Sequence, residues 1–150
     1  MKIDRGFLAF FIFCAAFLVR LVFFQFYGIE EFPDVKKYIE AADQLRNLNI
    51  VERHNIMPGY PIAIIAFGEY VWLADILLSS VTCVLLFFVS EKIFRSVHRY
   101  CSLAVGLVYA CFPHSIFFSV SGLTESLFVF LVVLAFLLFE LKRILYNLDL

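Results

Sequence analysis

Long apolar runs constrain the fold of this chain more than any other feature of its sequence. Residues 7–27 carry no charge except Arg20, and residues 100–119 contain no Asp, Glu, Lys or Arg. A helix of about 20 such residues crosses the hydrocarbon core of a bilayer. Apolar residues make up 63% of the 150 and charged residues only 17%, which is too apolar a composition for a soluble domain. We therefore expect an integral membrane protein.

The apolar runs predict an all-α integral membrane fold in which residues 1–150 form a single module. Four helices are expected to cross the membrane, over residues 7–27, 71–94, 100–119 and 124–145. The first is too long for the apolar part of a signal peptide and contains a charge, so we expect it to remain as an anchor. The longest connection, residues 28–60, is expected to form an outer loop.

The distribution of Lys and Arg predicts which side of the membrane each connection faces. Seven basic residues lie near the termini or between the second and third spans: Lys2, Arg5, Lys92, Arg95, Arg99, Lys142 and Arg143. Residues 28–60 hold four basic residues but six acidic ones, and residues 121–124 hold no basic residue. We therefore expect a multi-pass protein with both termini in the cytoplasm. The bacterial cell membrane is favoured over the endoplasmic reticulum, although the pattern fits both.

The outer loop carries a helical pattern of its own. Apolar or aromatic side chains recur at helical spacing, at Val35, Tyr38, Ile39, Ala42 and Leu45. The pattern predicts an amphipathic helix of about three or four turns that begins near Asp34 and lies on the membrane surface. The Pro-Gly-Tyr-Pro of residues 58–61 is expected to redirect the chain. Residues 62–70 then form a surface-lying or re-entrant helix before the second span.

Asp34 and Arg20 are the first candidate site residues. Asp34 follows Pro33 and either caps the loop helix or acts as a catalytic base, and spacing alone favours the cap. Arg20 lies about 10 Å inside the outer end of the first span. Because a buried charge there is costly, Arg20 either snorkels to the interface or contacts a lipid-linked phosphate or an acid such as Glu125.

Further candidates lie near the same membrane face. Glu125 opens the fourth span, where it either complements the helix dipole or orients a substrate hydroxyl or a cation. His114 follows the helix-breaking Pro113 and is more often an interfacial side chain than a ligand. Asp75 and Glu69 flank the start of the second span and are expected at the interface.

Several function classes are excluded or left without a motif. The chain contains no Gly-rich phosphate loop, no H-E-x-x-H and no G-x-S-x-G. Its net charge of −1 gives no basic footprint for nucleic acid. A transferase of this kind would need a donor delivered in the membrane.

Four features follow one another along the chain and together resemble a known family. They are Arg20 late in the first span, D-x-x-x-Y-x-x-x-A at Asp34, Tyr38 and Ala42, Met-Pro-Gly-Tyr-Pro at residues 57–61, and LVYACFPHSIFFSVSGLTESLF at residues 107–128. The combination is similar to the amino-terminal part of the membrane-embedded GT-C glycosyltransferases. These include protein O-mannosyltransferases, aminoarabinose transferases and GPI mannosyltransferases. The similarity covers nearly the whole chain.

The resemblance implies an enzyme that moves a mannose-like or other hexose or pentose from a polyprenyl- or dolichyl-phosphate donor to an acceptor hydroxyl at the outer membrane face. It implies Asp34 as the general base. The substrate-binding residues would be Arg20, Tyr38, Pro58, Gly59, Tyr60, His114 and Glu125. Many relatives have two adjacent acids where Asp34 is followed by Val35, so a divalent cation is left open. The expected partners are the lipid-linked sugar donor and membrane lipids.

Enzymes of this family have more spans than this chain, so we expect an incomplete module: a fragment, a truncated gene product, or a half-module that a partner chain would complete. The alternative is a non-catalytic multi-span membrane subunit or a small transport-related protein. In that case the small residues Ser102, Gly106 and Ala110 would pair with a partner helix, rather than serve only ordinary packing within the chain.

Overall fold

The computed structural model describes residues 4–27, 33–47, 56, 58–94, 99–122 and 124–146, and within these ranges the regular structure is helical, with no strand. In chain order the elements are α1 (Arg5–Tyr27), α2 (Pro33–Arg46), α3 (Gly59–Phe67), the short 3-10 helix η1 (Gly68–Tyr70), α4 (Val71–Ile93), α5 (Arg99–Ala110), α6 (Pro113–Phe118) and α7 (Glu125–Tyr146). The predicted all-α fold is confirmed. Met57, part of the Met-Pro-Gly-Tyr-Pro motif, lies outside the described residues.

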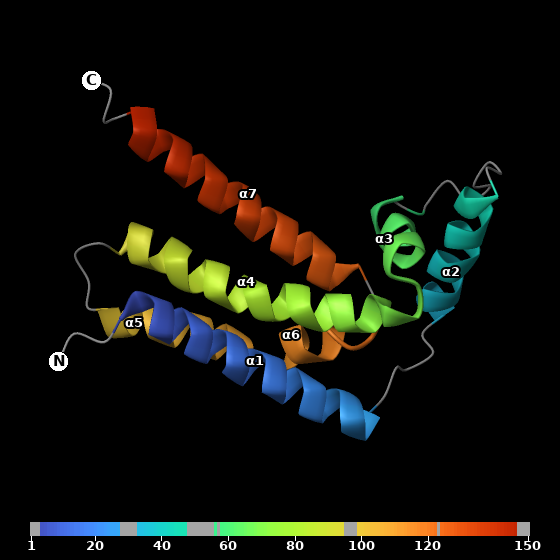
Figure 1. The fold of residues 1–150 in the computed structure, drawn as a ribbon, viewed down its shortest axis with the longest axis horizontal. Helices are drawn as coiled ribbons and strands as arrows, with labels where there is room; N and C mark the ends of the chain where they lie inside the picture. Colours follow the sequence, from blue (N-terminus) through green and yellow to red (C-terminus); the bar gives the residue numbers. More distant parts are fainter. Residues whose placement is uncertain are drawn as a thin grey trace.

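Helix α4 is the centre of the bundle. Helices α1, α5 and α7 pack against it, and α1 also contacts α5 (Figure 1). The buried apolar core lies where α1, α4 and α5 meet and consists of Leu8, Ile12, Ala16, Cys83, Phe87 and Ala110. Successive long helices run in alternating directions, so the start of α1 and the end of α7 lie at the same end of the bundle (Figure 1).

Two described segments are long and apolar enough to cross a membrane, namely α1 and the stretch Gly59–Ile93. Large apolar side chains face outward on α1 and on α7, among them Phe10, Phe26, Phe128 and Phe139. Such faces suit contact with lipid rather than water. These features suit membrane association, and the count of four spans stays a prediction.

The apolar stretch of residues 100–119 is two helices rather than the one expected. Helix α5 ends at Ala110 and α6 begins at Pro113, so the predicted break at this proline is confirmed. Proline has no N–H to offer the preceding turn, and its ring excludes the carbonyl four residues earlier. The carbonyl of Tyr109 instead accepts a hydrogen bond from the Ser115 hydroxyl at 2.7 Å.

Helices α3 and α4 are separate elements, as predicted for residues 62–70. Gly68 joins them with a φ of +57°, a left-handed backbone that favours glycine. Its N–H closes the end of α3 by donating to the carbonyl of Ile64. Because of this bend α3 does not continue the line of α4 (Figure 1). The position of α3 relative to a membrane surface stays a prediction.

Helix α2 confirms the predicted outer-loop helix and packs mainly against α3. Ala42 is buried as the pattern predicts, but Ala41 is buried beside it and Ile39 is 47% exposed. Each residue turns a helix by about 100°, so Ile39 is rotated away from the face that contains Tyr38 and Ala42. The apolar face of α2 is therefore shifted from the one expected.

The small-residue stripe of α5 is used inside the chain. Ser102, Gly106 and Ala110 are all buried. A Cβ atom at Gly106 would lie only 3.1 Å from Cδ1 of Ile12 and 3.2 Å from the carbonyl oxygen of Cys83. The stripe thus lets α5 approach α1 and α4 closely. Ordinary packing within the chain is confirmed, and the alternative, in which the stripe pairs with a partner helix, stays untested.

Candidate functional site

Most of the predicted site residues gather at one end of the bundle. Helices α2, α3 and α6 lie there, together with the end of α1 and the start of α7 (Figure 1). The opposite end is joined by a contact between Arg5 at the start of α1 and Glu91 near the end of α4, at 3.7 Å. The predicted association of the outer loop with the start of α7 is therefore present in the fold. The side of the membrane that this end faces stays a prediction.

Asp34 is an exposed carboxylate in the first turn of α2. Its side chain is 59% exposed, and its Oδ1 lies 2.5 Å from Nζ of Lys37, one turn later. The helix begins at Pro33, so Asp34 lies inside the first turn and not at the capping position expected. Proline is favoured at the first position of a helix because its missing N–H would have no partner there. Asp34 is thus paired with a cation and open to solvent.

A buried contact joins α2, α3 and α4. The Tyr60 hydroxyl of α3 donates a hydrogen bond to Oδ2 of Asp75 on α4 at 2.5 Å. The ring of Tyr38 on α2 meets the Tyr60 ring edge-on, with 5.4 Å between centroids. The expected position of Asp75 at the membrane interface stays a prediction, but both Tyr60 and Asp75 are enclosed by protein, with 2% of each exposed. The bend at Gly68 is the reason, because it places α3 beside the first turns of α4.

Glu125 is the first residue of α7 and lies next to this buried contact. Its carboxylate is close enough to interact electrostatically with both Tyr60 and Asp75. Its Oε2 atom is fully buried and accepts no hydrogen bond from the described part of the chain. The turn before it contains Gly122, where a Cβ atom would lie 3.5 Å from the Val35 side chain of α2. The Glu125 carboxylate thus lies within electrostatic range of the Tyr60–Asp75 pair.

Arg20 is fully enclosed in the bundle and does not belong to this cluster. Its Nε donates to the Ser79 hydroxyl at 2.9 Å and its Nη2 to the Ser115 hydroxyl at 3.1 Å. Its Nη1 donates to the carbonyls of Ala16 at 3.0 Å and Ala110 at 3.3 Å. At 0% exposure it does not snorkel, and these bonds go to serines and backbone rather than to Glu125.

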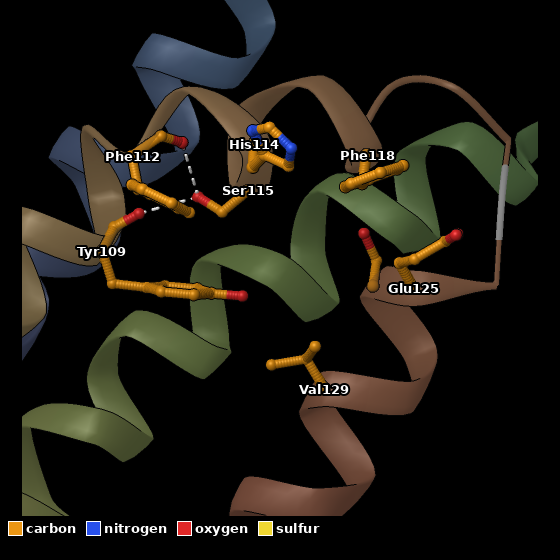
Figure 2. Close-up of a pocket in the computed structure, with 8 residues that line it drawn as sticks. Tyr109, Phe112, His114, Ser115, Phe118, Glu125 and Val129 are labelled. Carbon is orange, nitrogen blue, oxygen red and sulfur yellow. Dashed lines mark hydrogen bonds between the residues drawn. The ribbon is translucent and has the colours of Figure 1, made fainter.

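A pocket of about 220 Å³ lies between α5, α6 and α7 (Figure 2). It is lined by Tyr109, Phe112, His114, Ser115, Phe118, Glu125, Ser126 and Val129. His114 is exposed, and its ring centroid lies 5.9 Å from that of Phe112 and 5.7 Å from that of Phe118. The walls are mainly aromatic and apolar, which suits the hydrocarbon part of a ligand. Of the predicted site residues, the pocket combines His114 and Glu125.

The predicted site residues thus fall into separate environments. Asp34 is exposed, Tyr38 and Tyr60 touch in the buried contact, and Arg20 lies in the core. Pro58 and Gly59 are exposed at the start of α3, and a Cβ atom at Gly59 would meet no other atom within 4 Å. Within the ranges that the structure describes, no group of three or more His, Cys, Asp and Glu residues could hold a metal ion.

Asp75 is the residue of this region that sequence reasoning missed. The available signal was a carboxylate within an apolar helix, since an ionisable group inside a membrane segment is expected to have a partner or a function. What hid it was its position four residues from the start of α4, where an interfacial acid is ordinary. Its partner Tyr60 lies on another helix, and sequence spacing alone did not connect the two.

Comparisons of the chain with protein-family models, with curated proteins and with solved structures found no match. The similarity to GT-C glycosyltransferases therefore rests on the sequence motifs alone.

Proposed function

We propose that the chain is a membrane module of a glycosyltransferase that takes its sugar from a polyprenyl- or dolichyl-phosphate donor, with Asp34 as the general base. The observation that carries the proposal is the position of Asp34. It is an exposed carboxylate, paired with Lys37, at the end of the bundle that also contains Glu125 and the aromatic pocket. An exposed acid at the same end of the bundle as a pocket suited to hydrocarbon matches a substrate that is part sugar and part lipid.

The reaction needs one proton acceptor and one stabilised leaving group. The acceptor hydroxyl oxygen forms a bond to the anomeric carbon of the sugar, and its proton passes to the Asp34 carboxylate. The bond between that carbon and the phosphate oxygen breaks, and the lipid phosphate leaves with the electron pair. Positive charge stabilises the departing phosphate. Lys37 supplies such a charge beside Asp34, whereas Arg20 is fully buried and donates its hydrogen bonds to the core.

The aromatic pocket accounts for the lipid part of the proposal. Its walls include the rings of Tyr109, Phe112 and Phe118, and Val129 closes one side (Figure 2). An isoprenoid chain is hydrocarbon throughout, so these walls would shield it from water. His114 and Glu125 would then lie where the chain meets the phosphate and the sugar.

The test is transfer of radiolabelled mannose from polyprenyl-phosphate mannose in membranes that contain the full chain. Asp34→Asn should lower the transfer rate by about 100-fold or more, because general-base catalysis contributes roughly 10²- to 10⁴-fold. Asp43→Asn is the matched control, since it makes the same change at another exposed position of α2 and should leave the rate unchanged.

Three results would count against the proposal in different ways. Equal rates for the wild type and Asp34→Asn would remove Asp34 as the base. An equal loss in Asp34→Asn and Asp43→Asn would point to the stability of α2 instead. Transfer no greater than in membranes lacking the chain would favour a non-catalytic membrane subunit.

A further inference from the structure

We infer that the hydrogen bond between Tyr60 and Asp75 is a latch that fixes the α2–α3 pair against the bundle, which makes both of them positioning residues for Asp34. The role of the latch in catalysis, which is to position Asp34, rests on the proposed function. Its structural action, which is to hold α2 and α3 in place, does not depend on that function and can be tested separately.

The latch is needed because the chain itself does not fix the angle of α3. Helices α3 and α4 are joined through η1, and Gly68 has a φ of +57° instead of continuing an α-helix. Helix α3 packs mainly against α2 and makes only a small contact with α4. The α2–α3 pair therefore depends on a few specific contacts with the bundle.

The Tyr60–Asp75 hydrogen bond is the strongest of these contacts by its chemistry. It is 2.5 Å long, its acceptor is a carboxylate, and both side chains are buried. Burial excludes water that would compete for the bond, which makes it stronger than the same contact at the surface. Separating the pair would leave the Asp75 carboxylate enclosed without its donor, which is costly.

Helix α2 connects the latch to Asp34. The Tyr38 ring packs edge-on against the Tyr60 ring, and Tyr38 lies one turn after Asp34 on the same helix. Val35, next to Asp34, packs near Gly122 in the turn before α7. The first turn of α2 is thus held at two points, one through Tyr60 and one at Gly122. If α3 moved away from α4, the contact of Tyr38 with Tyr60 would no longer fix the position of Asp34.

Hydrogen–deuterium exchange of the full chain in detergent micelles tests the latch. Tyr60→Phe removes only the hydroxyl, and we expect amides of α2 and α3 to exchange about tenfold faster while those of α4 and α5 stay close to wild type. Asp75→Asn, made in the chain that keeps Tyr60, still offers an acceptor to the Tyr60 hydroxyl. Its exchange should stay close to wild type. Tyr70→Phe is the matched control, because Tyr70 is 68% exposed on η1 and the same change there should have no effect.

The latch is refuted if Tyr60→Phe speeds exchange equally in all helices, which would indicate general destabilisation, or if it changes exchange in none. Should Tyr60→Phe fail to accumulate in membranes, Asp75→Leu compared with Asp75→Asn makes the same distinction. Leucine should speed exchange in α2 and α3 and asparagine should not; equal behaviour of the two variants refutes the latch.

The transfer assay adds the catalytic part. Tyr60→Phe should lower kcat about tenfold with the KM for the donor unchanged, because a displaced base slows the reaction more than it weakens donor binding. An unchanged kcat alongside faster exchange in α2 would remove the positioning role and leave a structural latch. If the wild type itself transfers no sugar, the proposed function fails, and the exchange data still decide whether the latch exists.

Discussion

The bundle core and the α2–α3 end each contain a conspicuous charged side chain. Arg20 in the core is fully enclosed, whereas Asp34 at the α2–α3 end is exposed. In the core, each guanidinium nitrogen of Arg20 donates to a serine hydroxyl or a backbone carbonyl. At the α2–α3 end, Asp34 remains exposed, with Lys37 beside it. An enclosed charge that donates to several helices thus joins them, whereas the charge at the surface is paired with a neighbouring cation and open to solvent.

The partners of each charge explain the difference. Arg20 reaches the carbonyl of Ala110 because α5 ends there, before the proline that begins α6. Its other partners, Ser79 and Ser115, come from α4 and α6, so one side chain joins four helices with the help of the α1 backbone. Asp34 is 59% exposed, and within the described ranges its carboxylate is paired only with Lys37. These contrasting environments lead to predictions that differ in size.

Breaking the core region should have the largest effect. Arg20→Ala leaves the hydroxyls of Ser79 and Ser115 and the carbonyl of Ala110 without their donor. We expect the free energy of unfolding to fall by about 3–5 kcal/mol, because each buried acceptor left without a donor costs roughly 1–3 kcal/mol. Unfolding in mixed micelles of increasing SDS content, followed by circular dichroism, measures this change.

Arg46→Ala provides the control for that measurement, because Arg46 is an exposed arginine at the end of α2. Its effect should stay within about 0.5 kcal/mol. If the two alanine variants unfold at the same SDS content, Arg20 does not hold the core together.

A second, smaller effect should follow from crowding the core. Gly106→Leu places a side chain against Ile12 and the backbone of Cys83, and we expect the free energy of unfolding to fall by roughly 2–3 kcal/mol. Ala104→Leu, at an exposed position of the same helix, should have little effect in the same SDS titration. If Gly106→Leu left the stability unchanged but a copurifying protein were lost, the small-residue stripe of α5 would instead bind a partner chain.

The smallest effect, with the opposite sign, should come from the α2–α3 end. Glu125→Gln removes one of two neighbouring carboxylates, so repulsion with Asp75 disappears. We expect the free energy of unfolding to rise by roughly 1 kcal/mol at pH 8. Glu69→Gln, at an exposed position of η1, is the control and should change nothing. A loss of stability in Glu125→Gln would show that the Glu125 carboxylate has a favourable partner. The α2–α3 end would then resemble the core, where the charge of Arg20 also has its partners.

Much of the helical layout could be predicted because it depends on local sequence. The apolar runs predicted α1, α4 and α7, Pro113 predicted the break between α5 and α6, and the spacing after Asp34 predicted α2. The break at Pro113 was foreseen but its consequence was not, since the length of the apolar run suggested one continuous span. The face of α2 was shifted because Ala41, which carries little apolar signal, packs inward while Ile39 does not.

The candidate site was less predictable because its contacts join distant residues. Asp34 and Glu125 were expected at one end of the molecule, and the fold brings their helices there. The burial of Asp75 could not be inferred from its position near the start of an apolar helix. It depends on the angle at Gly68 that carries Tyr60 back to it.

The sequence by itself determined where the helices form and end, since periodicity, apolar length, proline and glycine act over a few residues. Only the tertiary structure decided which polar groups are enclosed and by what. The hydrogen bonds of Arg20 reach 59 residues along the chain to Ser79 and 95 to Ser115. Such contacts depend on how whole helices pack. Whether a charged side chain is enclosed in a core or left open to solvent therefore depends on which helices come to lie beside it.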